Sequence, residues 1–211
     1  DFPDEQLTLK PLVEERNQQD EGGSGSSDGE DPIARSVDDI REQLKTLMGY
    51  EESFDVLFRE MVYGGKKVGI LFLNGFTNDA ILTELIVRLT YLEEDEIEPD
   101  AFQRIFKEYL PHSQVNKVRN MSEVVDMVLA GNTAFFIDGS ETALVVDIKA
   151  FPQRGPEEPS TEKVVRGSKD GFIETIVTNI ALVRRRIRDP KLRMEMMSVG
   201  TRTKTDVCMA Y

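Results

Sequence analysis

Two pairs of apolar runs, each joined across a glycine turn, constrain the fold of this 211-residue chain more than any other feature. The runs VLFREMVY (56–63) and KVGILFL (67–73) flank Gly64-Gly65, and a tight hairpin turn needs the positive φ angles that glycine adopts without strain. TAFFID (133–138) and TALVVDIK (142–149) flank a second glycine turn. Because the runs are almost continuously apolar rather than alternating, we expect a sheet that helices cover on at least one face.

Amphipathic helices are predicted before and between the two hairpins. Residues 121–130 form one of them, with Asn120 as the N-cap, Glu123 three residues later and Gly131 as the stop. Together with the hairpins, the helices predict a compact αβ subdomain over residues 37–150. The other stripes of apolar residues at helical spacing are Val37, Ile40, Leu44 and Leu47; Ile81, Leu85, Leu89 and Leu92; and Phe102, Ile105, Phe106 and Tyr109.

Proline and glycine interrupt this pattern at FPQRGPEEPSTEKVVRG, so residues 151–168 are expected to be an extended connector. The longest helix signal of the chain follows and ends at Asp189-Pro190; its apolar residues are Phe172, Ile176, Ile180, Val183 and Ile187. The closing TDVCMAY is typical of a strand, and because such a strand normally has a partner, we expect the sequence to stop partway through a second subdomain. The predicted fold class is α/β (mixed): two small αβ subdomains, each a short mixed sheet packed with helices, with residues 169–211 as the beginning of the second.

The first 36 residues are acidic and poor in apolar side chains. They carry ten Asp or Glu against three Lys or Arg, a net charge of −7, and the tract EGGSGSSDGEDP has almost nothing to bury. A segment of this kind cannot offset the entropy that ordering would cost. Residues 1–36 are therefore expected to be a flexible acidic tail.

The scarcity of histidine and cysteine restricts the chemistry of the chain. One histidine, His112, and one cysteine, Cys208, exclude a histidine-based triad, an intramolecular disulfide and a cysteine-rich zinc site. The acidic run LEEDEIEPD (92–100) lacks the spacing and central glycine of a calcium loop. We therefore predict no cofactor, no metal site and no enzymatic activity. No apolar run approaches the ~20 residues of a membrane-spanning helix, so we expect this stretch of chain to be soluble.

The stretch TNIALVRRRIRDPKLR (178–193) gathers positive charge in a chain whose formal net charge is −13. Nucleic acid is an unfavourable partner, because the rest of the chain would repel phosphate and interleaved aromatic residues are missing. Arginine favours multidentate pairing with carboxylates, so we interpret the stretch as a pairing site between subdomains or subunits. At least one of Arg184, Arg185 and Arg186 should be buried and paired, and the outer arginines should be exposed. The residues of this predicted assembly site are Glu158, Glu162, Arg166, Glu174, Arg184, Arg185, Arg186 and Arg188.

Several motifs in a fixed order resemble one family. They are GNTAFFIDGSETALVV, EEPSTE, VVRG followed by DGFIET, TNIALVRRRIRDPKLR and VGTRTKTDV. From about residue 36 onward, and most specifically over residues 131–206, the chain is similar to the N-terminal hydrophilic domain of A-subunits of GerA-type spore germinant receptors. One departure is Ser168, where the family commonly has proline after the Arg-Gly pair, which implies a looser local turn.

This resemblance implies a membrane-embedded receptor subunit of the inner membrane of a dormant spore, with this domain expected on the cytoplasmic (core) face. The implied partners are the B and C subunits and other copies of the A-subunit, with no nucleic acid. The implied role is germinant sensing and signal transduction to ion release through protein–protein contacts. A second interpretation stays open: direct binding of an amino acid or a sugar in a cleft between the two subdomains.

Overall fold

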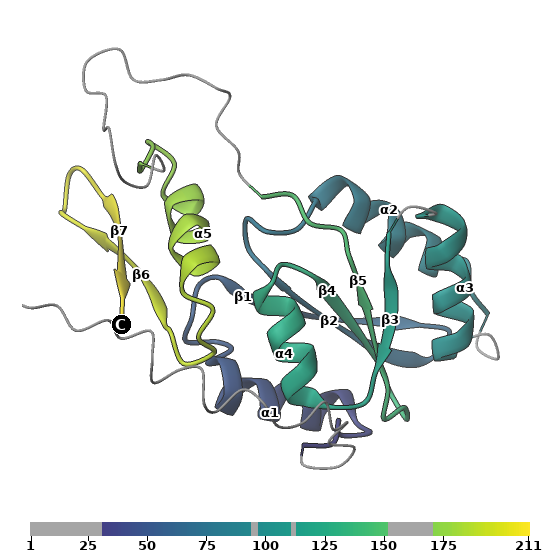
Figure 1. The fold of residues 1–211 in the computed structure, drawn as a ribbon. Coiled ribbons are helices and arrows are strands. Elements are labelled where there is room, and N and C mark those ends of the chain that lie inside the picture. Colours follow the sequence, from purple (N-terminus) through teal and green to yellow (C-terminus); the bar gives the residue numbers. More distant parts are fainter. Residues whose placement is uncertain (1–30, 94–96, 111–112, 152–170) are drawn as a thin grey trace, which may run out of the picture.

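The computed structural model describes residues 31–93, 97–110, 113–151 and 171–211. A five-stranded sheet lies between two layers of helices, and a separate hairpin of two strands lies beside the last helix (Figure 1). The predicted connector, apart from Phe151, and most of the predicted acidic tail lie outside the described residues. The elements in chain order are α1 (Val37–Met48), β1 (Val56–Tyr63), β2 (Lys66–Leu73), α2 (Asp79–Leu89), α3 (Pro99–Tyr109), β3 (Val115–Val118), α4 (Met121–Leu129), β4 (Thr133–Ile137), β5 (Ala143–Val146), α5 (Ile176–Arg186), β6 (Met194–Val199) and β7 (Thr205–Ala210).

The five-stranded sheet has the order β1-β2-β4-β5-β3, and all of its neighbouring strands are antiparallel. The α/β class is confirmed, but the expectation of a mixed sheet is wrong. Tight turns join β1 to β2 and β4 to β5, and the longer connection from β2 returns the chain in the opposite direction at β4. Strand β3 was not predicted, because it has only four residues and its two central side chains are exposed.

Helices cover both faces of this sheet, which explains why its strands are apolar on both sides (Figure 1). On one face, α1 and α4 pack on side chains such as Leu71 and Phe136. On the other face, α2 and α3 pack on Ile70 and Phe135. Ile70 of β2 is paired with Phe135 of β4, so both side chains lie on the same face of the sheet. Successive side chains of a strand point to opposite faces, so the next residue of each strand contributes to the opposite core.

Helix ends follow the capping pattern of the sequence. The Ser36 side chain accepts a hydrogen bond from the Asp38 backbone N–H at 3.2 Å, and α1 starts at the next residue. Asn120 accepts from the backbone N–H of Glu123 at 3.1 Å, which confirms its predicted role as the N-cap of α4. Helix α1 therefore starts beside Ser36, and the helix over residues 121–130 is placed correctly to within one residue. The described end of the predicted tail is part of the fold, since Ile33 is buried and Pro32 forms a β-bridge with Asn120.

The C-terminal segment departs further from the sequence predictions. Helix α5 starts at Ile176 and not at Phe172, whose side chain is exposed. The prediction that it is the longest helix is wrong, because α5 has 11 residues and α1 has 12. The predicted final strand is observed as β7, and it pairs with β6, a strand that was not predicted. Strand β6 has the sequence MEMMSV, in which only one residue is β-branched, and its propensity alone did not reveal it.

Candidate functional site

Helix α5 carries Arg184, Arg185 and Arg186 in its last turn, at the boundary between the sheet domain and the β6–β7 hairpin. Its buried side consists of Ile180, Ala181 and Arg184, which lie on one face because residues four apart align on a helix. Gly75 lies close beneath this face, since a Cβ atom added there would be 3.2 Å from the Cβ of Ala181. The helix therefore points Arg184 inward while its neighbours at 185 and 186 face outward.

Arg184 forms a bidentate ion pair with Asp55, which precedes β1. Its Nε donates to Oδ2 of Asp55 at 2.6 Å and its Nη2 to Oδ1 at 3.1 Å. Both side chains are only 1% exposed. Desolvating two charges is costly, and the fork geometry of guanidinium and carboxylate compensates for part of that cost.

The remaining donors of Arg184 bind backbone oxygens of the following loop. Nη1 donates to the carbonyl of Asp189 at 2.9 Å, and Nη2 donates to the carbonyl of Leu192 at 2.9 Å. Within the described residues no buried side-chain nitrogen or oxygen lacks a partner. The guanidinium thus fixes the path of the chain between α5 and β6 as well as the position of α5.

Ser53 connects the Arg184–Asp55 pair to β6. Its hydroxyl donates to Oδ1 of Asp55 at 2.7 Å and accepts from the backbone N–H of Met194 at 3.0 Å. The backbone N–H of Phe54 donates to the carbonyl of Met194 at 2.7 Å. Cys208 of β7 lies near this cluster, and burial together with the Asp55 carboxylate raises the pKa of its thiol. The hairpin is therefore joined to the loop between α1 and β1.

The other residues of the predicted assembly site are not gathered around this cluster. Arg185 is exposed and stacks over the Phe151 ring, with its guanidinium carbon 4.5 Å from the ring centroid. Arg186, Arg188 and Glu174 are exposed as well. The last three members of the predicted site, Glu158, Glu162 and Arg166, lie outside the described residues.

The prediction that at least one arginine is buried and paired is confirmed at Arg184, but its partner was missed. Asp55 and Ser53 are 129 and 131 residues away in sequence, so no local spacing connects them to α5. The available signal was the position of Asp55 in FDVLF, an acid between apolar residues at the start of a buried strand. A carboxylate in such a position is almost never buried without a partner.

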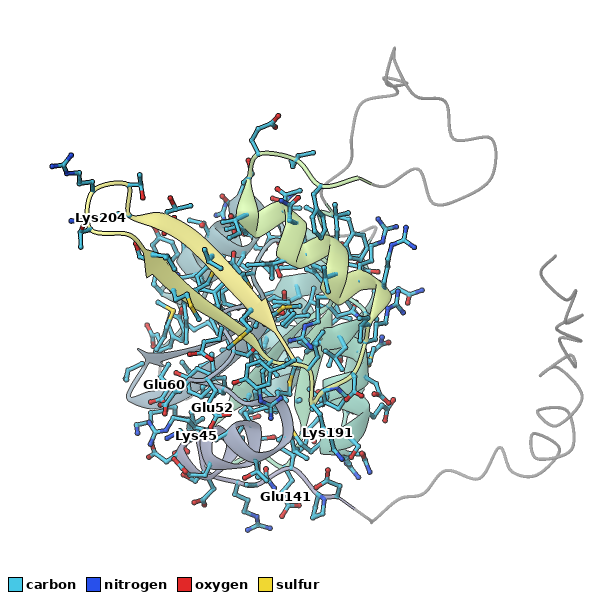
Figure 2. The ribbon with its side chains drawn as sticks, turned by 90° about the vertical axis from the view of Figure 1, so that its left-hand side faces the viewer. Lys45, Glu52, Glu60, Glu141, Lys191 and Lys204 are labelled. Atoms are coloured by element: carbon cyan, nitrogen blue, oxygen red, sulfur yellow. The ribbon has the colours of Figure 1, made fainter. Side chains whose placement is uncertain are left out.

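Charge is divided unevenly along the chain. Residues 171–211 carry eight Lys or Arg against four Asp or Glu, whereas residues 31–151 carry 12 against 22. Figure 2 shows charged side chains around the hairpin, with Lys204 at its tip and Glu52 and Glu60 on the elements below it. The C-terminal segment is thus a basic layer on an acidic domain.

An open pocket of about 410 Å³ lies within the sheet domain, away from α5 and the hairpin. Asp100 and Lys117 form an ion pair at its wall, and the hydrogen bond from Lys117 lowers the pKa of Asp100. No cluster of His, Cys, Asp or Glu in the described ranges is arranged to hold a metal ion, and no helix there is long and apolar enough to cross a membrane. The pocket is lined by Pro99, Asp100, Lys117, Val118, Arg119, Glu123 and Thr142.

The family was determined by comparison with known proteins. Residues 42–211 match the family described as Bacillus/Clostridium GerA spore germination protein. The chain belongs to this family. It is 41% identical over 170 residues to stage V sporulation protein AF of Bacillus subtilis (strain 168), covering 81% of this chain and 34% of that protein. It is 31% identical over 159 residues to spore germination protein GerLA of Bacillus cereus, covering 74% of this chain and 32% of that protein.

A solved structure supports the fold. The N-terminal domain of the A subunit of the Bacillus megaterium spore germinant receptor GerK3 superposes with a TM-score of 0.65 at 24% identity. The superposition covers 85% of this chain and 66% of that one. The GerA chain described here therefore has the fold of a germinant-receptor A-subunit N-terminal domain, and it spans about a third of the length of the curated relatives that it matches.

Proposed function

We propose that this chain is a domain of a spore germinant-receptor A-subunit that takes part in germinant sensing and passes the signal towards ion release through protein–protein contacts. Membership of the GerA family and the fold of the GerK3 domain support the receptor role. The role is a non-enzymatic one. We place the whole protein in the inner spore membrane, with this domain on the core face. The name of one relative, an uncharacterized membrane protein of Bacillus subtilis (strain 168), supports the membrane location.

The observation that supports the contact role is the different exposure of the arginines in and after α5. Arg184 is buried and paired with Asp55, whereas Arg185, Arg186 and Arg188 are exposed at the surface. Exposed guanidinium groups favour planar pairing with carboxylates of a partner protein. The proposed assembly site comprises these arginines with Glu174 and with Glu158, Glu162 and Arg166 of the connector. Its partners are the B and C subunits and other copies of the A-subunit.

We also propose that residues 37–150 and 169–211 belong to different subdomains. The hairpin β6–β7 forms its own sheet and is not an extension of the five-stranded one, which supports this division. A two-stranded sheet is marginally stable by itself, so the hairpin depends on its attachment through Arg184 or on further strands.

Direct binding of a nutrient is the alternative function. The pocket between α3, β3 and α4 favours it, because its wall offers both a carboxylate and cationic groups that suit a zwitterionic ligand. This position is within the sheet domain and differs from the cleft between subdomains that the sequence suggested.

Thermal melting of the 211-residue chain against a panel of amino acids and sugars separates the two functions. A ligand at 100 times its Kd stabilises the folded state by about 2.7 kcal/mol, or roughly 5–10 °C in Tm for a domain of this size. The contact role predicts no saturable shift with any member of the panel. A saturable shift that Lys117→Glu removes would establish the pocket as a binding site and contradict the proposal.

A further inference from the structure

An aromatic patch lies on the outer side of α2 and α3, and it consists of Val87, Arg88, Tyr91 and Tyr109. Val87 and Tyr91 are four residues apart and lie on the same side of the end of α2, where the backbone N–H of Tyr91 donates to the carbonyl of Arg88 at 3.2 Å. The exposed fractions of Val87, Tyr91 and Tyr109 are 44%, 76% and 41%. A group of large exposed apolar side chains is unlike the scattered single ones of an ordinary surface and indicates a contact site.

Arg88 connects the two tyrosines of the aromatic patch. Its guanidinium carbon lies 4.5 Å from the centroid of the Tyr109 ring, and its Nη2 pairs with Oε1 of Glu84 at 2.7 Å. The hydrogen bond to Glu84 raises the pKa of Arg88, and the nearby hydroxyls of Tyr109 and Tyr91 raise it further. Both tyrosines therefore lie near one guanidinium. Tyrosine and arginine are also the residue types that contribute most to binding at the centre of protein interfaces.

The aromatic patch is on the side of the sheet domain that faces away from the C-terminal segment. Helices α2 and α3 lie on one side of the domain, and α5 with the β6–β7 hairpin lies on the opposite side (Figure 1). The inner sides of α2 and α3 pack on the sheet through Leu85, Leu89 and Phe106, each of which is fully buried. The patch therefore belongs to the sheet domain alone and does not adjoin the β6–β7 sheet.

The surroundings of the aromatic patch are acidic. Residues 79–110 carry nine Asp or Glu against three Lys or Arg, and Arg88, one of the three, is already paired. Glu108 is exposed next to Tyr109, whereas Lys107 is two residues from Tyr109 and projects from a different side of α3. Lysine and arginine stack on tyrosine rings and pair with carboxylates, so this surface suits a cationic partner. The same charges repel the phosphates of nucleic acids and anionic lipids.

We propose that the aromatic patch binds a loop rich in Lys and Arg that belongs to a membrane-embedded partner protein. Cytoplasmic loops of membrane proteins carry an excess of Lys and Arg, so the core face of the membrane presents ligands of this chemistry. The rings of Tyr91 and Tyr109 receive the cationic groups, and Val87 contacts their aliphatic stems. The inference rests on the proposed function only for the placement of this domain on the core face. It gives the domain a second contact surface, opposite in charge to the exposed arginines of α5.

Photo-crosslinking in the full-length protein tests the contact. With p-benzoylphenylalanine in place of Val87, irradiation of spore membranes should join residue 87 to a Lys- or Arg-rich loop of another membrane protein, and mass spectrometry identifies the joined peptides. Tyr91→Ala should lower the yield of this cross-link at least tenfold, as expected for the loss of a tyrosine anchor. Salt at about 1 M, which shortens the Debye length to about 3 Å, should lower the yield several-fold.

Thr46 provides the matched control, because it is exposed on α1, which packs on the other face of the sheet. The cross-linker in place of Thr46 should not reach the same loop, and Thr46→Ala should leave the yield at residue 87 unchanged. Tyr91→Ala changes a side chain that is 76% exposed, so the Tm should stay within about 2 °C of the wild-type value. A lower yield at an unchanged Tm then reports the contact and not unfolding.

Several results would overturn the inference. They are the absence of a cross-link from residue 87, and a cross-link to the membrane region of the same chain, to a second copy, to lipid or to a soluble protein. An unchanged yield with Tyr91→Ala overturns it as well. A cross-link to a basic loop of a membrane protein outside the germinant receptors would support the inference and count against the proposed function. The two can therefore fail separately.

Discussion

Arg184 belongs to a charged motif typical of a protein surface, but its side chain is buried in the core. A helix with three successive arginines predicts a solvated end, and two of the three behave that way. The third is 1% exposed and meets a carboxylate that is equally buried. A pair of this kind adds little net stability compared with an apolar pair, but removing one charge leaves the other desolvated and unpaired.

Substitution of Asp55 by asparagine measures this dependence. Asp55→Asn keeps the shape of the side chain and removes its charge, so the free energy of unfolding in urea should fall by about 3–5 kcal/mol. Glu84→Gln is the matched control, because Glu84 pairs with Arg88 on the exposed side of α2. That substitution should cost about 0–1 kcal/mol. Equal effects of the two substitutions would show that the Arg184–Asp55 pair does not stabilise the fold.

At the residue scale, the sequence predicted that one arginine of residues 184–186 is buried and paired, but it identified neither that arginine nor its partner. The prediction rested on the cost of burying an unpaired guanidinium. The choice of Asp55 over a nearby glutamate depends on tertiary packing over 129 residues. Local rules such as capping and helical periodicity carry no information about contacts at that separation.

Elements were predictable where both the turn chemistry and the apolar pattern agreed. The hairpins β1–β2 and β4–β5 satisfy both conditions, and three of their four predicted strands match the observed ones to within one residue. The fourth was predicted too long, because β5 ends at Val146 and not at residue 149. Strands β3 and β6 were missed because they lie at sheet edges or on an exposed hairpin, where few side chains are buried. Edge strands obtain their conformation from hydrogen bonds to a neighbour, which the sequence of the strand itself does not display.

The attachment of the β6–β7 hairpin can be followed through the chain's one cysteine. Burial and the Asp55 carboxylate raise the pKa of Cys208, which lowers its thiolate fraction at pH 8, so iodoacetamide should alkylate it several-fold more slowly than free cysteine. Arg184→Met should loosen the hairpin and increase the alkylation rate. Arg188→Met, at an exposed position near the same helix end, should not. Identical rates in the two variants would exclude Arg184 as the anchor of the hairpin.

At the scale of the whole molecule, an acidic sheet domain carries a basic C-terminal layer. The Arg184 cluster fixes this layer in place by internal contacts, and its outward side chains include the cations beyond Arg184. The inner side of the layer therefore stabilises the fold, and we propose that its outer side makes the contacts with partner proteins.

Charge reversal of Arg188 tests this assignment most directly. Arg188→Glu changes an exposed group, so the Tm of the isolated chain should stay within about 2 °C of the wild-type value. In the full-length receptor, the same substitution should reduce co-purification of the B and C subunits and impair germination. Lys107→Glu, at an exposed position in the last turn of α3, is the control and should affect neither. Normal co-purification and normal germination with Arg188→Glu would contradict the assignment, and so would unfolding of the isolated chain.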